Sequence, residues 1–267
     1  MSKEQQNAVM AFDDVAGDYY QGLDPQAFTM PFLALLQGLS PQCQRGNPAY
    51  VKDAAPGMIL NTLTGKLYER LDVSVAKRTH SLCWWTPRDK GGGWLGEIEL
   101  ERPGTEAEQR FMALPLDEKK RRIDKDGNEW TEHRNFFCRI VAADNAREPV
   151  VVSQTKSQLK TARDWNSLID LYSARVPARS PDGQVITGQD GRPLMRPALG
   201  SEIWTLSSKL RTKGENSWFM WTVAHKGRHN NVVVLDDVKA AIAAAKEMKL
   251  LARPAPEDPE EAPSGEM

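Results

Sequence analysis

Several motifs in this chain contain residues that could do chemistry, but none of them is a complete catalytic site. Gly91, Gly93 and Gly96 have the spacing of a dinucleotide-binding loop. That loop must lead into a helix, whereas the following segment 97–100 alternates like a strand. A Gly-rich hairpin that can approach a phosphate chain closely is the better interpretation. The chain has no P-loop, Gly-x-Ser-x-Gly or His-Glu-x-x-His motif.

The candidate metal-binding motifs also lack some of the ligands or glycines that such sites need. The segment 124–129 begins like a calcium-binding loop but has Glu129 where that loop needs glycine, so we expect an Asp-Gly turn. The pairs His80/Cys83 and His225/His229 supply two ligands each, whereas zinc needs three or four. We therefore predict no metal, no cofactor and no catalytic set, and we expect a protein that is not an enzyme.

Basic residues interleaved with tryptophan are the more informative pattern. Between Arg134 and Lys213 there are thirteen Lys and Arg against seven Asp and Glu. Binding of single-stranded nucleic acid needs cations that follow phosphates and flat rings that stack on bases. The predicted nucleic-acid-binding residues form three clusters: Trp84, Trp85, Arg88, Lys90 and Trp94; Lys156, Lys160 and Arg163; and Lys209, Arg211, Lys213 and Trp218. The alternative for each cluster is a solvated basic face over core tryptophans.

Backbone geometry decides which tryptophans can face solvent. Neighbours on a strand point to opposite faces, so one of Trp84 and Trp85 should face outward. Trp218 and Trp221 are three residues apart and should also lie on opposite faces. Trp165 lies among apolar residues with helical spacing, close to the second basic cluster.

Most of the elements that must position these clusters are strands. A hairpin that turns at Thr64-Gly65 is predicted after Pro56. Strands are also predicted where apolar residues alternate or run together, over 71–76, 81–85, 94–101, 135–143, 149–153, 203–212 and 217–226. Helices are predicted over 104–121, 153–175 and 236–252. Residues 176–201 contain two Asp-Gly pairs and should form a turn-rich excursion. The predicted class is α+β, rich in β-structure, with inserted helices and a C-terminal helix.

The two ends of the chain differ from the body. Residues 1–28 have five acids and one Lys and should form a loosely ordered acidic arm. Residues 29–253 should form a single domain. The segment 254–267 should be a disordered tail with five acids and no Lys or Arg, namely Glu257, Asp258, Glu260, Glu261 and Glu266.

The tail masks the charge of the body. The chain has 35 Lys and Arg against 36 Asp and Glu, and without residues 254–267 the count is 35 against 31. A mildly basic body with an acidic tail suits a protein that binds nucleic acid and regulates that binding. The other interpretation of the tail is a device for solubility.

Composition also restricts where the protein works. No run of 18 apolar residues occurs, and the N-terminal segment lacks the pattern of a signal peptide. Three cysteines are few and odd in number, which favours a reducing compartment without structural disulfides. We expect a soluble intracellular protein that does not interact with membranes.

Several strings in the chain resemble a group of tailed-bacteriophage single-stranded DNA-binding proteins. The strings are PFLALLQGLSPQ (31–42), GMILNTLTGKLY (57–68), GGGWLGE (91–97) and SQTKSQLKTARDWNSLI (153–169). The resemblance extends from Pro31 to about Lys226. It implies an OB-like barrel core, a role in coating single-stranded DNA, and an acidic tail that recruits replication enzymes. Met267 stands where many such tails end in a bulkier residue.

These observations lead to one preferred function and two alternatives. The preferred hypothesis is a sequence-independent single-stranded DNA-binding protein of phage replication or recombination, in the cytoplasm of the bacterial host. Its tail would compete with DNA and recruit replication or recombination proteins. The alternatives are an enzyme of DNA metabolism, either a metal-dependent nuclease or an annealing recombinase, and a phage structural or protein-binding protein. The sequence leaves open whether the chain forms a homodimer.

Overall fold

The computed structural model describes six stretches of the chain, and the account below concerns these residues: 31–87, 90–100, 102–141, 148–180, 182–188 and 190–228. Four sequence-based predictions lie outside them: the arm 1–28, the tail 254–267, the helix over 236–252 and the role of Arg88. Within the six stretches, no helix is long and apolar enough to span a bilayer.

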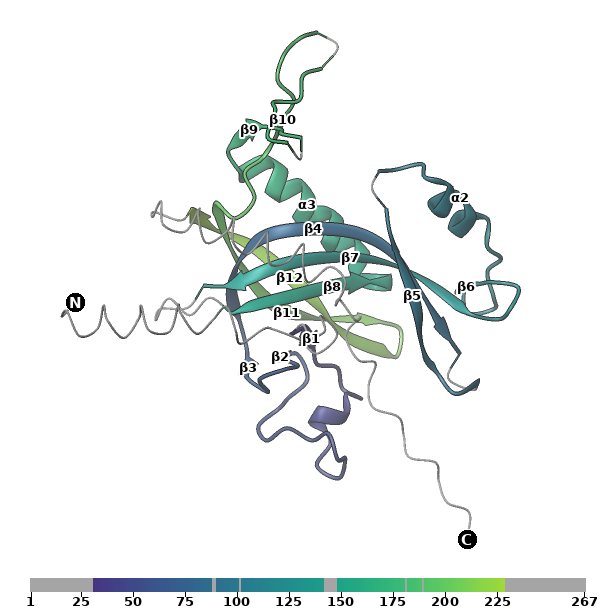
Figure 1. Cartoon of the computed structure of the whole chain (residues 1–267). Coiled ribbons are helices and arrows are strands. Elements are labelled where there is room, and N and C mark those ends of the chain that lie inside the picture. Colours follow the sequence, from purple (N-terminus) through teal and green to yellow (C-terminus); the bar gives the residue numbers. More distant parts are fainter. Residues whose placement is uncertain are drawn as a thin grey trace, which may run out of the picture.

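A seven-stranded antiparallel sheet forms the body of the protein (Figure 1). Its order is β12-β11-β4-β7-β6, while β5 pairs with β4 and β8 pairs with β7. These strands are β4 (Leu71–Thr86), β5 (Gly93–Glu99), β6 (Arg122–Ile123), β7 (Glu129–Ile140), β8 (Pro149–Thr155), β11 (Glu202–Lys213) and β12 (Asn216–Arg228).

Two smaller sheets and two short 3-10 helices complete the β-rich body. One sheet contains β1 (Leu33–Leu35), β2 (Ile59–Asn61) and β3 (Leu67–Tyr68), and the other contains β9 (Arg175–Pro177) and β10 (Met195–Pro197). The 3-10 helices are η2 (Pro41–Cys43) and η4 (Lys156–Gln158). The predicted turn-rich excursion runs between β9 and β10 and projects from the body (Figure 1).

The long strand β4 organises the main sheet. It spans 16 residues and pairs with β7 along nearly its whole length. Its other edge pairs with β11 at the start of the strand and with β5 at the end. A bulge between Val75 and Lys77 interrupts the ladder, and such bulges bend a strand. The strand is visibly curved in Figure 1.

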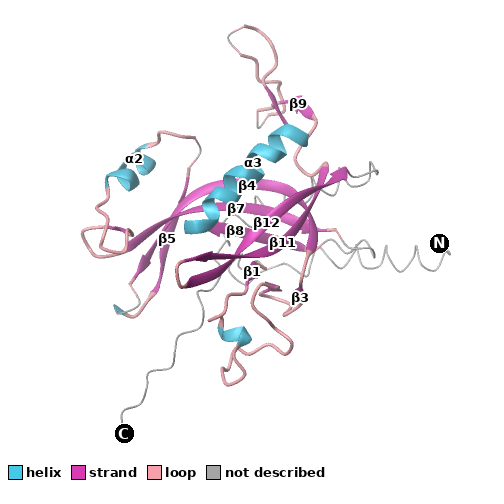
Figure 2. Ribbon diagram, turned by 180° about the vertical axis from the view of Figure 1, so that it is seen from behind, coloured by secondary structure: helices cyan, strands magenta, loops and turns pink. Residues whose placement is uncertain are grey.

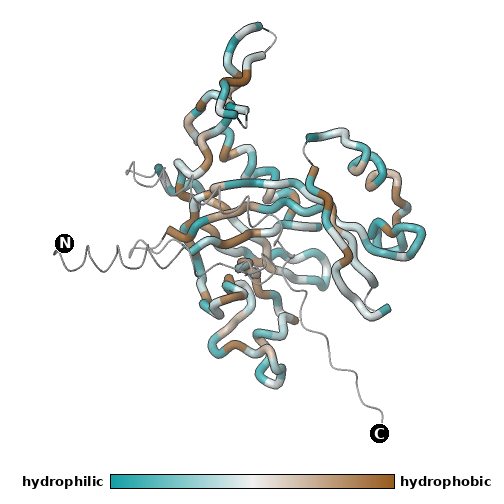
Figure 3. Tube along the Cα trace, viewed as in Figure 1, coloured by the Kyte–Doolittle hydropathy of each residue, from teal (hydrophilic) through white to brown (hydrophobic). Residues whose placement is uncertain are grey.

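The main hydrophobic core lies between the sheet and α3 (Leu159–Tyr172), which crosses one face of the sheet in Figure 2. Trp165 on this helix is fully buried. Its ring stacks on Phe136 with 4.1 Å between centroids and meets Trp204 edge-on at 6.4 Å. Figure 3 shows hydrophobic residues along these central strands and more hydrophilic residues in the peripheral loops.

Two glutamine side chains form hydrogen bonds with backbone groups of β12 on the edge that faces away from β11. Gln37 accepts a hydrogen bond from the Phe219 N–H at 2.8 Å and donates to the Phe219 carbonyl at 3.2 Å. Gln158 accepts from the Trp221 N–H and donates to the Phe219 carbonyl, both at 3.1 Å. The two amide groups therefore take the place of a neighbouring strand, because buried backbone groups need partners.

The structure confirms an α+β, β-rich class and corrects three details. Among the described strands, β8 and β12 do not pair, so the sheet is open rather than a closed barrel. The helix predicted over 104–121 is shorter, because α2 (Glu106–Ala113) ends before Pro115, and proline disfavours helix in the preceding residue. The helix predicted over 153–175 begins at Leu159, because β8 continues to Thr155.

Replacing Gln158 with Ala should lower the free energy of unfolding by about 1–2 kcal/mol, because backbone groups of β12 lose their partner in a partly buried seam. Urea denaturation measures the change. Gln44→Ala is the matched control, since this exposed amide donates to the Leu39 carbonyl, and its effect should stay within about 0.5 kcal/mol. Equal effects of the two substitutions would contradict the role assigned to Gln158.

Candidate nucleic-acid interface

The hairpin of β11 and β12 presents a basic outer face. Leu206 is fully buried and points to the core. Side chains alternate along a strand, so Lys209, Arg211 and Lys213 share the opposite face, and all three are exposed. Trp218 lies opposite Arg211 in the register. The third predicted cluster is therefore brought together on one surface.

Electrostatic pairing distinguishes these cations from Lys160 of the second cluster. In the part of the chain that the structure describes, Lys209, Arg211 and Lys213 have no ion-pair partner. By contrast, Lys160 pairs with Asp164 at 3.0 Å. Unpaired cations can exchange their counterions for phosphates.

The tryptophans of this hairpin lie on opposite faces, as predicted. Trp221 is buried in the core, whereas Trp218 is half-buried on the basic face. A partly exposed ring beside unpaired cations has the composition of a base-stacking platform.

The first cluster lies on the β4–β5 hairpin, and its adjacent tryptophans again face opposite ways. Trp84 stacks on Trp130 at 4.7 Å between centroids, and its ring leaves no room for a side chain at Gly96. Trp85 faces His133 at 6.5 Å. Trp94 lies opposite Trp85 in the register and is 42% exposed.

The accessible aromatic surface of this cluster is therefore on the side of Trp85 and Trp94. Lys90 is exposed, and its ammonium lies close to the turn at Gly127.

The second cluster is divided by the start of α3. Lys156 belongs to η4, whereas Lys160 and Arg163 lie on the exposed side of the helix. The three cations therefore do not lie on one helix, although the sequence predicts a helix over 153–175. Trp165 is part of the core and is excluded as a stacking platform.

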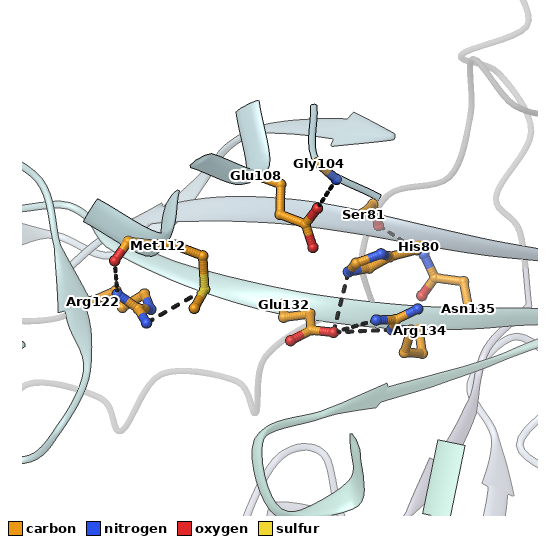
Figure 4. Close-up of polar contacts among 9 residues, drawn as sticks. All are labelled: His80, Ser81, Gly104, Glu108, Met112, Arg122, Glu132, Arg134 and Asn135. Atoms are coloured by element: carbon orange, nitrogen blue, oxygen red, sulfur yellow. Dashed lines mark hydrogen bonds and ion pairs between the residues drawn. The ribbon is translucent and has the colours of Figure 1, made fainter. Parts of the chain in front are cut away.

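Sequence reasoning missed a polar network that joins β4 and β7. Glu132 contacts His80 at 3.1 Å and Arg134 at 2.8 Å (Figure 4). The hydrogen bond from His80, together with the Arg134 charge, lowers the pKa of Glu132 to about 2. Glu132 and Arg134 share a face of β7, so strand alternation was the available signal.

A second contact in the same region ties α2 to the sheet. The Arg122 guanidinium donates to the Met112 carbonyl at 2.8 Å (Figure 4) and to the Leu114 carbonyl at 3.1 Å. It also lies over the Phe111 ring at 4.9 Å. Arg122 therefore serves to position α2, and it is not free to bind a phosphate.

Burial changes the chemistry of His133, which lies between Trp85 and β8. Its Nδ1 is 3.1 Å from the Ser153 hydroxyl. Burial, with the nearby Lys156 charge, lowers the pKa of His133 to about 4. The imidazole is therefore neutral near pH 7. Among the described residues, no group of three or more His, Cys, Asp or Glu is arranged to hold a metal ion.

Comparison with known proteins places the chain in a bacteriophage protein class. Residues 2–251 match the model of the family described as Pam3 phage gp34-like protein. The chain belongs to this family, and the predicted bacteriophage origin is confirmed. Neither the curated proteins nor the solved structures contain a significant match.

His133 should make stability depend on pH. Its folded pKa of about 4 lies below the ordinary value of 6.5, so its contribution is complete above pH 6.5 and is lost as the pH falls toward 4. Between pH 7.5 and pH 5 the free energy of unfolding should fall by about 2 kcal/mol more in the native protein than in His133→Gln.

Urea denaturation of both proteins at the two pH values measures this difference. Glu132 does not interfere, because a carboxylate whose pKa is lowered from 4.5 to about 2 loses its contribution only at more acidic pH. The same pH dependence in both proteins would show that His133 is not buried in its neutral form.

Proposed function

We propose that the protein binds single-stranded DNA without sequence preference during phage DNA replication or recombination in the host cytoplasm. The observation that carries this proposal is the outer face of the β11–β12 hairpin. It holds three cations at alternate positions, none with an ion-pair partner within the described stretches, beside the half-buried Trp218. Such a face supplies both parts of single-strand binding, cations for phosphates and a ring for bases.

The order of the strands supports an OB-like core for this function. Taken in chain order, β4, β7, β8, β11 and β12 are strands one to five, and they lie in the spatial order 3-2-1-4-5. The helix α3 comes between the third and fourth strands. An OB-fold is a five-stranded Greek-key barrel that is partly open, so the unpaired seam between β8 and β12 is compatible with it.

The positions of two clusters support the same proposal. OB-folds bind oligonucleotides through the loop between strands one and two and the loop between strands four and five. Here the first connection begins with the hairpin that bears Trp85 and Trp94, and the second is the β11–β12 hairpin with Arg211 and Trp218. Both hairpins point to the same side of the molecule in Figure 1.

We also propose that the acidic tail regulates DNA binding. Residues 254–267 have five acids and no Lys or Arg, so they can compete with DNA phosphates for the basic surface. DNA binding would then release the tail for replication or recombination proteins. This role rests on the charge of the sequence alone.

Neutralising the hairpin should weaken DNA binding and its salt dependence. In the triple variant Lys209→Gln, Arg211→Gln, Lys213→Gln, the slope of log affinity against log salt for oligo-dT should become shallower by about 2, because a single-strand phosphate contact contributes about 0.7. A matched control removes three other exposed cations, Arg45, Lys52 and Arg196, which likewise have no ion-pair partner among the described residues, and should change the slope little. Fluorescence anisotropy at several salt concentrations measures both.

Trp218→Ala should weaken oligo-dT binding about 5- to 150-fold, because a stacked base contributes about 1–3 kcal/mol. Trp218→Phe should retain most of the affinity, since it keeps a flat ring. If the native protein shifts no single-stranded oligonucleotide at low salt, the proposal fails in favour of a protein-binding role. Mg²⁺-dependent loss of labelled DNA would instead indicate a nuclease.

Deleting residues 254–267 should tighten oligo-dT binding and steepen its salt dependence, because the tail no longer occupies the basic surface. Titrations of the full chain and of residues 1–253 under the same salt conditions measure the change. If the two affinities are equal, the tail does not compete with DNA and serves solubility instead.

A further inference from the structure

Glu129, the first residue of β7, holds two cations from different parts of the chain. Its Oε1 lies 3.0 Å from the Lys156 ammonium, and its Oε2 lies 3.2 Å from the Arg121 guanidinium. Lys156 follows the end of β8, and Arg121 precedes β6, so the ends of two other strands meet at this carboxylate. The residue opposite Glu129 on β4 is Trp85.

Exposure differs between the carboxylate and its partners. The side chains of Lys156 and Arg121 are 65% and 40% exposed, whereas that of Glu129 is 17% exposed. An anion that arrives from solvent can therefore reach both cations. Asp117 also holds Arg121, at 2.7 Å, so the guanidinium keeps its orientation if Glu129 releases it.

The backbone at Lys156 directs this side chain to the site. Its φ angle is 48°, in a left-handed region that residues other than glycine seldom adopt. This conformation turns the chain from β8 into η4, so Lys156 meets Glu129 instead of continuing the row of Lys160 and Arg163 on α3. Backbone strain of this kind tends to occur at functional positions.

We propose that Arg121, Lys156 and Trp85 form a phosphate-and-base subsite of the DNA surface, and that Glu129 occupies the phosphate position when DNA is absent. This proposal rests on the proposed function. Carboxylates and phosphates offer similar paired oxygens to Arg and Lys, so a backbone phosphate of single-stranded DNA can replace the carboxylate. Glu129 thus weakens binding by competing for the same cations.

Removing the competing charge should strengthen binding. Glu129→Gln should tighten oligo-dT binding about 2- to 30-fold, the range expected when two surface ion pairs no longer oppose the DNA. The salt slope should steepen by about 0.7, because Lys156 becomes free to exchange its counterions for a phosphate, whereas Arg121 keeps its ion pair with Asp117. Arg121→Gln and Lys156→Gln should each weaken binding, and the double variant should abolish the gain from Glu129→Gln.

Glu148→Gln is the matched control. It removes one carboxylate from an exposed ion pair, with Lys66 at 2.6 Å, near the other end of β8. The overall change in charge is identical, so a general electrostatic effect would tighten binding equally in both variants.

The outcomes separate the two proposals. If the native protein binds oligo-dT while Glu129→Gln and Glu148→Gln behave alike, the subsite is refuted and the proposed function stands. If Glu129→Gln alone gains affinity and loses it again with Arg121→Gln and Lys156→Gln, the subsite is supported. Absence of oligo-dT binding by both the native protein and Glu129→Gln overturns both proposals.

Discussion

An open sheet must satisfy the hydrogen-bonding groups along its edges, and the arrangement of this protein depends on how β12 does so. Gln37 and Gln158 bond to the backbone of β12 from two segments that are distant in sequence. Gln158 belongs to η4, which also carries Lys156. The hydrogen bonds between Gln158 and β12 therefore also fix the position of Lys156 relative to the β11–β12 hairpin. One set of amide hydrogen bonds joins separate basic segments into one structural unit.

Ion pairing, more than the number of basic residues, decides which cations can act on a ligand. The excess of Lys and Arg between residues 134 and 213 includes side chains that already have partners, such as Lys160 with Asp164 and Arg134 with Glu132. Counterion release depends on the cations that remain unneutralised. On the β11–β12 hairpin the un-neutralised cations are Lys209, Arg211 and Lys213, within the described part of the chain. At η4, by contrast, Glu129 neutralises Lys156.

Much of the fold could be predicted from alternation and helical spacing, because these patterns record which side of an element is buried. They correctly placed Trp84 and Trp85, and likewise Trp218 and Trp221, on opposite faces. They could not show which strands pair, so the open seam and the two partners of Glu129 were not predictable. Such contacts depend on the register between distant segments, and no local motif encodes that register.

The curvature of β4 brings the two candidate DNA-binding hairpins to the same side of the molecule. A straight strand of its 16 residues would extend about 50 Å, and β11 pairs with its first residues whereas β5 pairs with its last. On a flat sheet the two pairings would lie far apart. Because β4 is curved, the β4–β5 and β11–β12 hairpins point the same way in Figure 1, which is the arrangement that one continuous DNA-binding surface requires.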